Sequence, residues 1–145
     1  MELNLISPYL VAIFCAWFSA HIIKYCISRV KKEKFRFKSQ LFTSGGMISS
    51  HSATVVSMTT IIGLKDGVTS GLFGMSVLLA LVVMYDAMKV RRSSGEQGEA
   101  IISLIKEQES QIRLPHVAKG HTPVEVFLGA SLGLVISIIV FLSTK

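Results

Sequence analysis

The chain has 145 residues and a formal net charge of +6, and half of its residues are hydrophobic. This length is typical of one domain, and the mean hydropathy of +0.56 exceeds what a soluble core needs. We therefore expect a single membrane-embedded domain over residues 1–145. The basic residues between Lys24 and Lys38 directly follow a hydrophobic span, so we do not expect a nucleic-acid partner.

The first apolar segment, Leu3 to Ile23, contains no Asp, Glu, Lys or Arg. About 20 apolar residues cross a bilayer as one helix. The segment lacks the features of a cleaved signal peptide, since it follows the acidic Glu2 and carries the bulky pair Trp17 and Phe18 where small residues would be needed. It is expected to stay attached as a membrane span.

Three further apolar segments follow, at Ser52 to Leu64, Val68 to Met88 and Val124 to Leu142. The last two are long enough to cross. The segment that ends at Leu64 is short, but a helix that begins at Gly46 would reach roughly 27 Å at 1.5 Å per residue. All-α architecture with about four transmembrane helices is the predicted fold.

The basic residues support this topology. With four crossings, the segments Lys24 to Ser50 and Lys89 to His121 share one side and hold 13 of the 15 basic residues, whereas Lys65 and Lys145 lie opposite. Loops rich in Lys and Arg stay in the cytoplasm, so both termini are expected outside.

A polar helix with one apolar side is predicted between Ser93 and Gln111 on the cytoplasmic side. Its apolar residues are Ile101, Ile102, Leu104 and Ile105. Ser93-x-x-Glu96 has the pattern of a capping box, which would start the helix. Such a helix suits the bilayer surface or the side of the bundle, as a connector rather than as a binding site for a partner.

Ionisable side chains gather at the predicted cytoplasmic ends of the four spans. They are Lys24, His51, Asp86, Arg91, Arg92, His121 and Glu125. Ionisable groups near a membrane usually face the bundle interior or a polar cavity, so this convergence predicts a functional site. Each residue alone also suits a structural role, and Asp86 suits an ion pair with Lys89 or Arg91 equally well. His21 and His116 are expected to be structural.

Cations combined with helix N-termini favour a phosphate ligand. The segment from Gly45 to His51 is a turn into a helix start, where Ser49, Ser50 or Ser52 can cap the helix or donate to an oxygen. The turn lacks the Gly-Lys-Ser/Thr ending of a P-loop, which disfavours nucleotide hydrolysis.

His51 and His121 suggest which reaction the site could catalyse. His121 and Glu125 share one helical face, so the carboxylate can orient the imidazole for attack on phosphorus. His51 can protonate the leaving alkoxide and later activate water. The acids near the membrane ends are Asp86 and Glu125, and they do not form the carboxylate cluster of a two-metal phosphatase. A site without metal or cofactor is therefore expected.

Three segments in order resemble the divergent branch of the type 2 phosphatidic acid phosphatase superfamily, which also contains the vanadium haloperoxidases. They are Ser49-Ser50-His51-Ser52-Ala53, Asp86-Ala87-Met88-Lys89-Val90-Arg91-Arg92 and Gly120-His121-Thr122-Pro123-Val124-Glu125. The resemblance extends from the first span to the last and implies phosphate binding without a metal. It gives His51 the role of the acid/base and His121 that of the nucleophile. Glu125 would be the orienting acid, and Arg91 or Arg92 the phosphate-binding arginine.

The chain also departs from the superfamily pattern. Pro-Ser-Gly-His reads Ile48-Ser49-Ser50-His51, the Arg and the nucleophilic His lie far apart, and the final Asp is Glu125. The first motif, a Lys followed by Arg-Pro, is missing. Lys24 is a candidate substitute, and Lys38 is its competitor.

The sequence thus predicts a lipid phosphate phosphatase at the cytoplasmic face of a bacterial inner membrane. Phosphatidylglycerophosphate or phosphatidic acid is the expected type of substrate, with an isoprenyl pyrophosphate as the alternative. A second hypothesis is a catalytically silent membrane module that binds anionic lipid headgroups through Lys24 to Lys38, as the missing motif would allow. A transporter is disfavoured, because four short helices leave little room for alternating access. The oligomeric state stays open.

Overall fold

The computed structural model describes residues 7–30, 48–115, 117 and 120–144. Their helices are α1 (Pro8–Val30), α3 (Ser50–Lys65), α4 (Gly71–Tyr85), α5 (Arg91–Glu107) and α6 (Pro123–Ser143), and a π-helical turn, η1 (Asp86–Val90), joins α4 to α5. The predicted all-α class is confirmed. Three helical segments are long and apolar enough to cross a membrane, namely α1, the continuous segment Gly71–Glu107, and α6.

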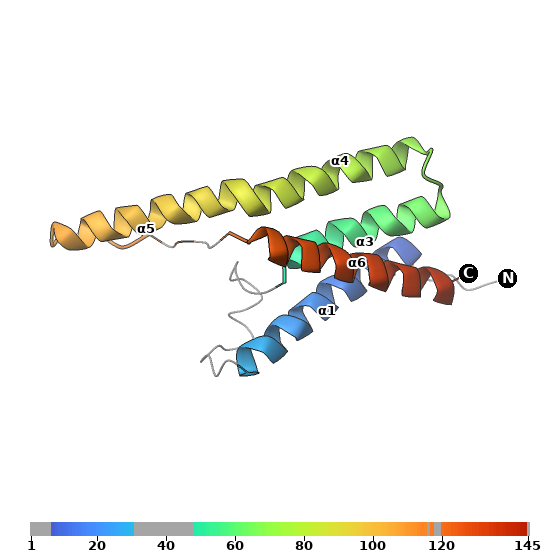
Figure 1. Ribbon diagram of the computed structural model, residues 1–145, viewed down its shortest axis with the longest axis horizontal. Helices are drawn as coiled ribbons and strands as arrows, with labels where there is room; N and C mark the ends of the chain where they lie inside the picture. The colour runs from blue at the N-terminus through green and yellow to red at the C-terminus, as the bar shows by residue number, and fades with distance from the viewer. Residues whose placement is uncertain (1–6, 31–47, 116, 118–119, 145) are drawn as a thin grey trace.

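Helix α3 lies at the centre of the bundle and packs against α1, α4 and α6. Figure 1 shows that the start of α1 and the end of α6 share one end of the bundle, whereas α3 and α6 both begin at the other. Helix α3 has 16 residues and begins at Ser50. Gly46, where its start was predicted, lies outside the described residues. The crossing of the membrane by α3 therefore stays a prediction.

Small residues at four-residue spacing bring α6 onto α3. Gly129 and Gly133 are buried on α6, and a Cβ added to Gly133 would collide with the carbonyl oxygen of Ala53. Close approach of small residues is how helices associate in lipid, where no hydrophobic force drives them together. One helical turn beyond Gly133, the hydroxyls of Ser57 and Ser137 are 2.7 Å apart, and the Ser137 hydroxyl donates to the Ser57 carbonyl at 2.8 Å.

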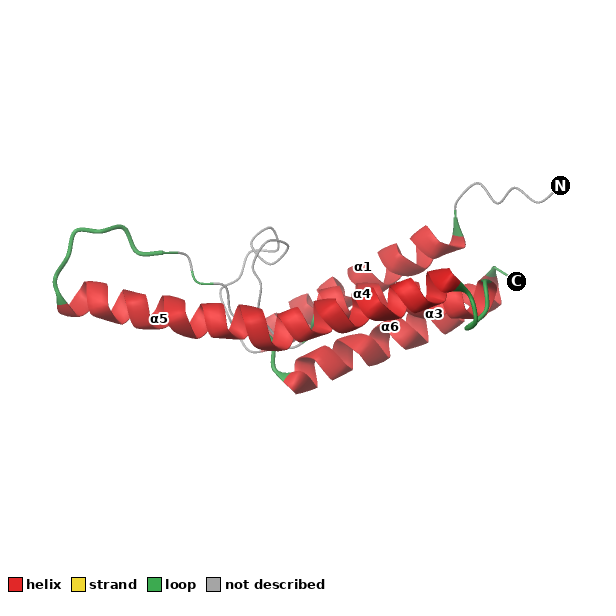
Figure 2. Cartoon of the chain, turned by 90° about the horizontal axis from the view of Figure 1, so that it is seen from above, coloured by secondary structure: helices red, strands yellow, loops and turns green. Residues whose placement is uncertain are grey.

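The predicted polar helix is present but does not start where the sequence suggested. Helix α5 continues α4 through η1 and has no side-chain cap at its start, so the capping box at Ser93 is wrong. Extending a formed helix adds one hydrogen bond per residue without a new nucleus, and so no cap is needed. Helix α5 extends away from the other helices rather than along them (Figures 1 and 2). Its apolar Ile101 and Leu104 remain 49% and 56% exposed.

Candidate functional site

Lys24 lies inside the bundle on α1. The sequence placed it at the end of the first span, which is wrong, because α1 continues to Val30. The Lys24 side chain is only 9% exposed and shares the buried face of α1 with His21 and Ser28. Among the residues that the structure describes, no hydrogen bond or ion pair is formed by its ammonium group.

The starts of α3 and α6 are joined directly. The Ser49 hydroxyl oxygen caps α3 by accepting the N–H of Ser52 at 3.3 Å and the Ser52 hydroxyl at 2.8 Å. The Ser49 N–H donates to the carbonyl oxygen of Glu125 at 3.2 Å. Two helix N-termini, each with partial positive charge, therefore lie at the same end of the bundle.

His121 is held by the cap of α6. Thr122 and Glu125 form a capping box, in which the Glu125 carboxylate accepts the Thr122 N–H at 2.9 Å. The same carboxylate oxygen, Oε2, lies 3.3 Å from His121 Nδ1. A carboxylate can only accept, so Nδ1 carries the hydrogen and Nε2 keeps its lone pair. The imidazole, only 3% exposed, is thus oriented with Nε2 as the ring atom that carries the lone pair.

The π-helical turn fixes the other side of His121. The Arg91 N–H donates to the carbonyl of Asp86, five residues earlier, instead of to that of Ala87. The Ala87 carbonyl accepts the His121 N–H at 3.0 Å. Such π turns recur at functional sites because they free backbone groups and redirect side chains. Here the turn docks the backbone of His121 against η1.

The two candidate arginines have different surroundings. The Arg91 guanidinium donates to the Asp86 carboxylate at 2.6 Å, with both side chains about one-third exposed. Arg92 pairs with Glu96 at 3.1 Å on the exposed side of α5. The charge of Arg91, unlike that of Arg92, acts on both His51 and His121.

Electrostatic interactions connect residues from four parts of the fold. The titratable groups that interact electrostatically with His51, the second residue of α3, are Arg91, His121, Lys24 and His21. Burial lowers the pKa of the His121 imidazole, the hydrogen bond and charge of Glu125 oppose this shift, and Lys24 and Arg91 reinforce it. The net lowering of the His121 pKa favours the neutral imidazole.

The structure thus brings together Lys24, His51, Arg91, His121 and Glu125, with Asp86 beside Arg91. Ser49 and Ser50 are buried at the start of α3. Lys38 lies outside the described residues. Sequence reasoning missed Ala87 and Gly120. A Cβ on Gly120 would collide with the backbone of Arg92, and a glycine directly before His121 was the available signal.

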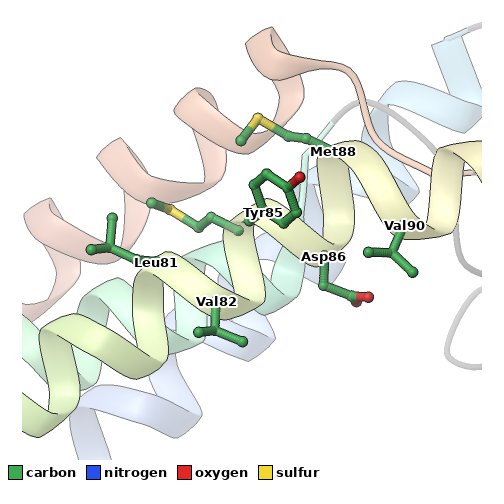
Figure 3. Close-up of a pocket in the computed structure, with 7 residues that line it drawn as sticks. Leu81, Val82, Tyr85, Asp86, Met88 and Val90 are labelled. Carbon is green, nitrogen blue, oxygen red and sulfur yellow. The ribbon is translucent and has the colours of Figure 1, made fainter.

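An apolar groove runs along the outer side of α4 and η1. It is lined by Leu81, Val82, Met84, Tyr85, Asp86, Met88 and Val90. Val82, Asp86 and Val90 follow one another along one side of the helix (Figure 3). Asp86 therefore connects the groove to the polar cluster through its ion pair with Arg91.

No three His, Cys, Asp or Glu side chains within the described part of the chain are placed to hold a metal ion. The absence of a metal from the working site stays a prediction.

These features define a helical, multi-pass membrane protein with a buried polar cluster at one end of its bundle. The chain belongs to the Divergent PAP2 family, whose model matches residues 5–136 and so includes all three motifs. It is similar to a Bacillus subtilis (strain 168) protein named "Uncharacterized membrane protein YuiD", with 34% identity over 155 aligned residues that cover 96% of each chain. No solved structure matches the chain. The resemblance inferred from the motifs is confirmed.

Proposed function

We propose that the chain is a lipid phosphate phosphatase that hydrolyses a terminal phosphomonoester, without a metal, through a phosphohistidine on His121. One observation carries the proposal most directly. The carboxylate of Glu125, itself held by the cap of α6, orients a buried imidazole whose Nε2 is free to attack. Family membership agrees with this chemistry, and the buried cation of Lys24 supplies the charge that a phosphate would neutralise.

The reaction proceeds in two displacements. The Nε2 lone pair of His121 attacks phosphorus, the bond from phosphorus to the lipid oxygen breaks, and His51 gives its proton to the leaving alkoxide. Water then attacks the phosphohistidine and gives a proton to His51. The P–N bond breaks, its electron pair returns to Nε2, and inorganic phosphate leaves. Arg91 and Lys24 stabilise the negative charge of the phosphoryl group in both steps.

The surroundings of the cluster favour a lipid as the substrate. Membrane spans of this length would set the proposed site near hydrocarbon, and the apolar groove of Figure 3 includes Asp86, which pairs with Arg91. A substrate of the phosphatidylglycerophosphate or phosphatidic acid type fits one phosphate plus acyl chains, with an isoprenyl pyrophosphate as the alternative. In this proposal α3 also crosses the membrane, and the site faces the cytoplasm of a bacterial inner membrane.

Phosphate release from a panel of lipid phosphates in detergent tests the proposal. We expect release that persists in EDTA, that vanadate inhibits as a mimic of the transition state, and that is accompanied by an acid-labile phosphoryl label on His121. Loss of activity with EDTA, or full activity in His121→Ala, would overturn the mechanism. Binding to anionic vesicles that vanadate does not affect, without any phosphate release, would favour the silent headgroup-binding module instead.

A further inference from the structure

His21 is a buried histidine that the proposed reaction does not yet use. Its side chain is 6% exposed, and its ring packs on Trp17 with centroids 4.4 Å apart. Nδ1 lies 2.9 Å from the carbonyl oxygen of Trp17. Because a carbonyl only accepts, Nδ1 carries the hydrogen and Nε2 holds the lone pair of the ring. Nε2 has no hydrogen-bond partner among the described residues, which is uncommon for a buried polar atom.

The position of His21 relates it to the reacting groups. Lys24 lies one turn later on the same buried face of α1. Ala20, the residue before His21, packs in one cluster with Ile48 and Ala53, which flank the start of α3. His51 lies in that start, and His21 is one of the groups whose charge would act on it. His21 therefore lies on the buried side of α1, the helix that packs against the one carrying His51.

We propose that His21 is the positioning residue of His51, accepting its ring N–H at Nε2 through one bridging water. This inference rests on the proposed function. The hydrogen bond would present the other ring nitrogen of His51 to the leaving oxygen and later to the attacking water. When His51 takes the proton of that water, the proton stays on His51, and the lone pair of His21 stabilises the resulting imidazolium. The Trp17 carbonyl, by holding the hydrogen on Nδ1, keeps the lone pair on Nε2.

A purely structural His21 would behave differently under substitution. If the ring only fills space beside Trp17, a phenyl group of similar shape serves equally well. If Nε2 supports His51, removing the nitrogen slows the step that needs His51 as a base. That step is hydrolysis of the phosphohistidine. When it becomes slower, phosphorylated His121 accumulates.

The experiment measures the level of phosphorylated His121 and the rate of its hydrolysis in full-length protein in detergent, with a lipid phosphate that the wild type hydrolyses. In His21→Phe we expect hydrolysis to slow by about tenfold or more, with little change in KM and a higher level of phosphoenzyme. His21→Gln offers an amide oxygen as acceptor and should recover much of the rate. Ile22→Phe adds the same phenyl group on the outward side of α1, where Ile22 is 44% exposed, and should behave as wild type.

The outcomes separate the two proposals. A wild type that releases phosphate without any label on His121 overturns the proposed function and this inference with it. A labelled wild type together with an unchanged His21→Phe overturns the role of His21 alone. Equal losses in His21→Phe and His21→Gln would also overturn it, because the acceptor would then not matter. If His21→Phe does not fold, His21→Met is compared with His21→Gln in the same way.

Discussion

The two ends of the helical bundle use their ionisable residues in opposite ways. At the end where α3 finishes, the Tyr9 hydroxyl donates to the Asp66 carboxylate at 2.8 Å, and Lys65 donates to the Thr144 carbonyl at 3.4 Å. These side chains satisfy one another at the surface. At the end where α3 begins, Lys24 and His121 are buried. Burying the Lys24 ammonium without a close partner is unfavourable, and the proposed function accounts for this cost through an anionic substrate.

The nucleophile gives the sharpest test of this difference. His121→Ala should lower phosphate release by at least about 10³-fold, because no other imidazole within the described residues is buried and held by a carboxylate. The measurement is single-turnover phosphate release together with phosphoryl labelling. Asp66→Asn, which breaks the surface pair at the opposite end, should leave both unchanged. Equal losses in the two variants would remove the distinction between the ends.

The two arginines after Asp86 should differ in their effects. Arg91→Gln should reduce kcat/KM by roughly 100-fold, since a hydrogen bond to a charged group contributes up to about 3 kcal/mol. Arg92→Gln removes only a surface pair with Glu96, and such pairs contribute about 1 kcal/mol or less. Steady-state kinetics on one lipid phosphate compare the variants. A larger effect at Arg92 would transfer the phosphate-binding role to that residue.

The orienting acid should affect both rate and pH dependence. Glu125 raises the pKa of His121 against the lowering by burial, so Glu125→Gln leaves burial less opposed and lowers that pKa further. Attack needs the neutral imidazole, and the acid limb of kcat/KM should therefore move to lower pH. The maximal rate should fall by roughly tenfold because the ring is less well oriented. A profile that moves to higher pH would contradict this assignment.

One sequence pattern shows why helix starts were only partly predictable. Ser93-x-x-Glu96 and Thr122-x-x-Glu125 both match a capping box, yet only the second one caps a helix. Pro123 follows Thr122, and its fixed φ and missing N–H suit a first helical position. The chain before Ser93 is already helical, so no start is needed there. The boundaries of the apolar spans followed more simply from hydropathy, as for α6, predicted at 124–142 and observed at Pro123–Ser143.

The candidate site was predictable in its members but not in its construction. Charge bias and span length were sufficient to place Lys24, His51, Arg91 and His121 at one end of the bundle. The π-helical turn was not predictable, because the Ala87 carbonyl that it frees accepts a hydrogen bond from His121, which is distant in the sequence. The depth of Lys24 was also missed, since hydropathy alone suggested that the first helix ends at the first charge.

The smallest expected effects concern stability at the two ends. A Cβ on Gly129 would collide with the carbonyl oxygen of Ser49, at the join of α3 and α6, so Gly129→Ala should destabilise the fold by about 1–3 kcal/mol. Gly71, at the start of α4 and at the opposite end, has no atom within 4 Å of an added Cβ. Gly71→Ala should therefore be neutral or stabilise the fold by up to about 1 kcal/mol. Thermal denaturation in one detergent measures both. Because the carbonyl of Ser49 belongs to the backbone, it cannot move aside as a flexible side chain would. Equal melting temperatures of the two variants would therefore mean that α3 and α6 are not packed as closely as the site requires.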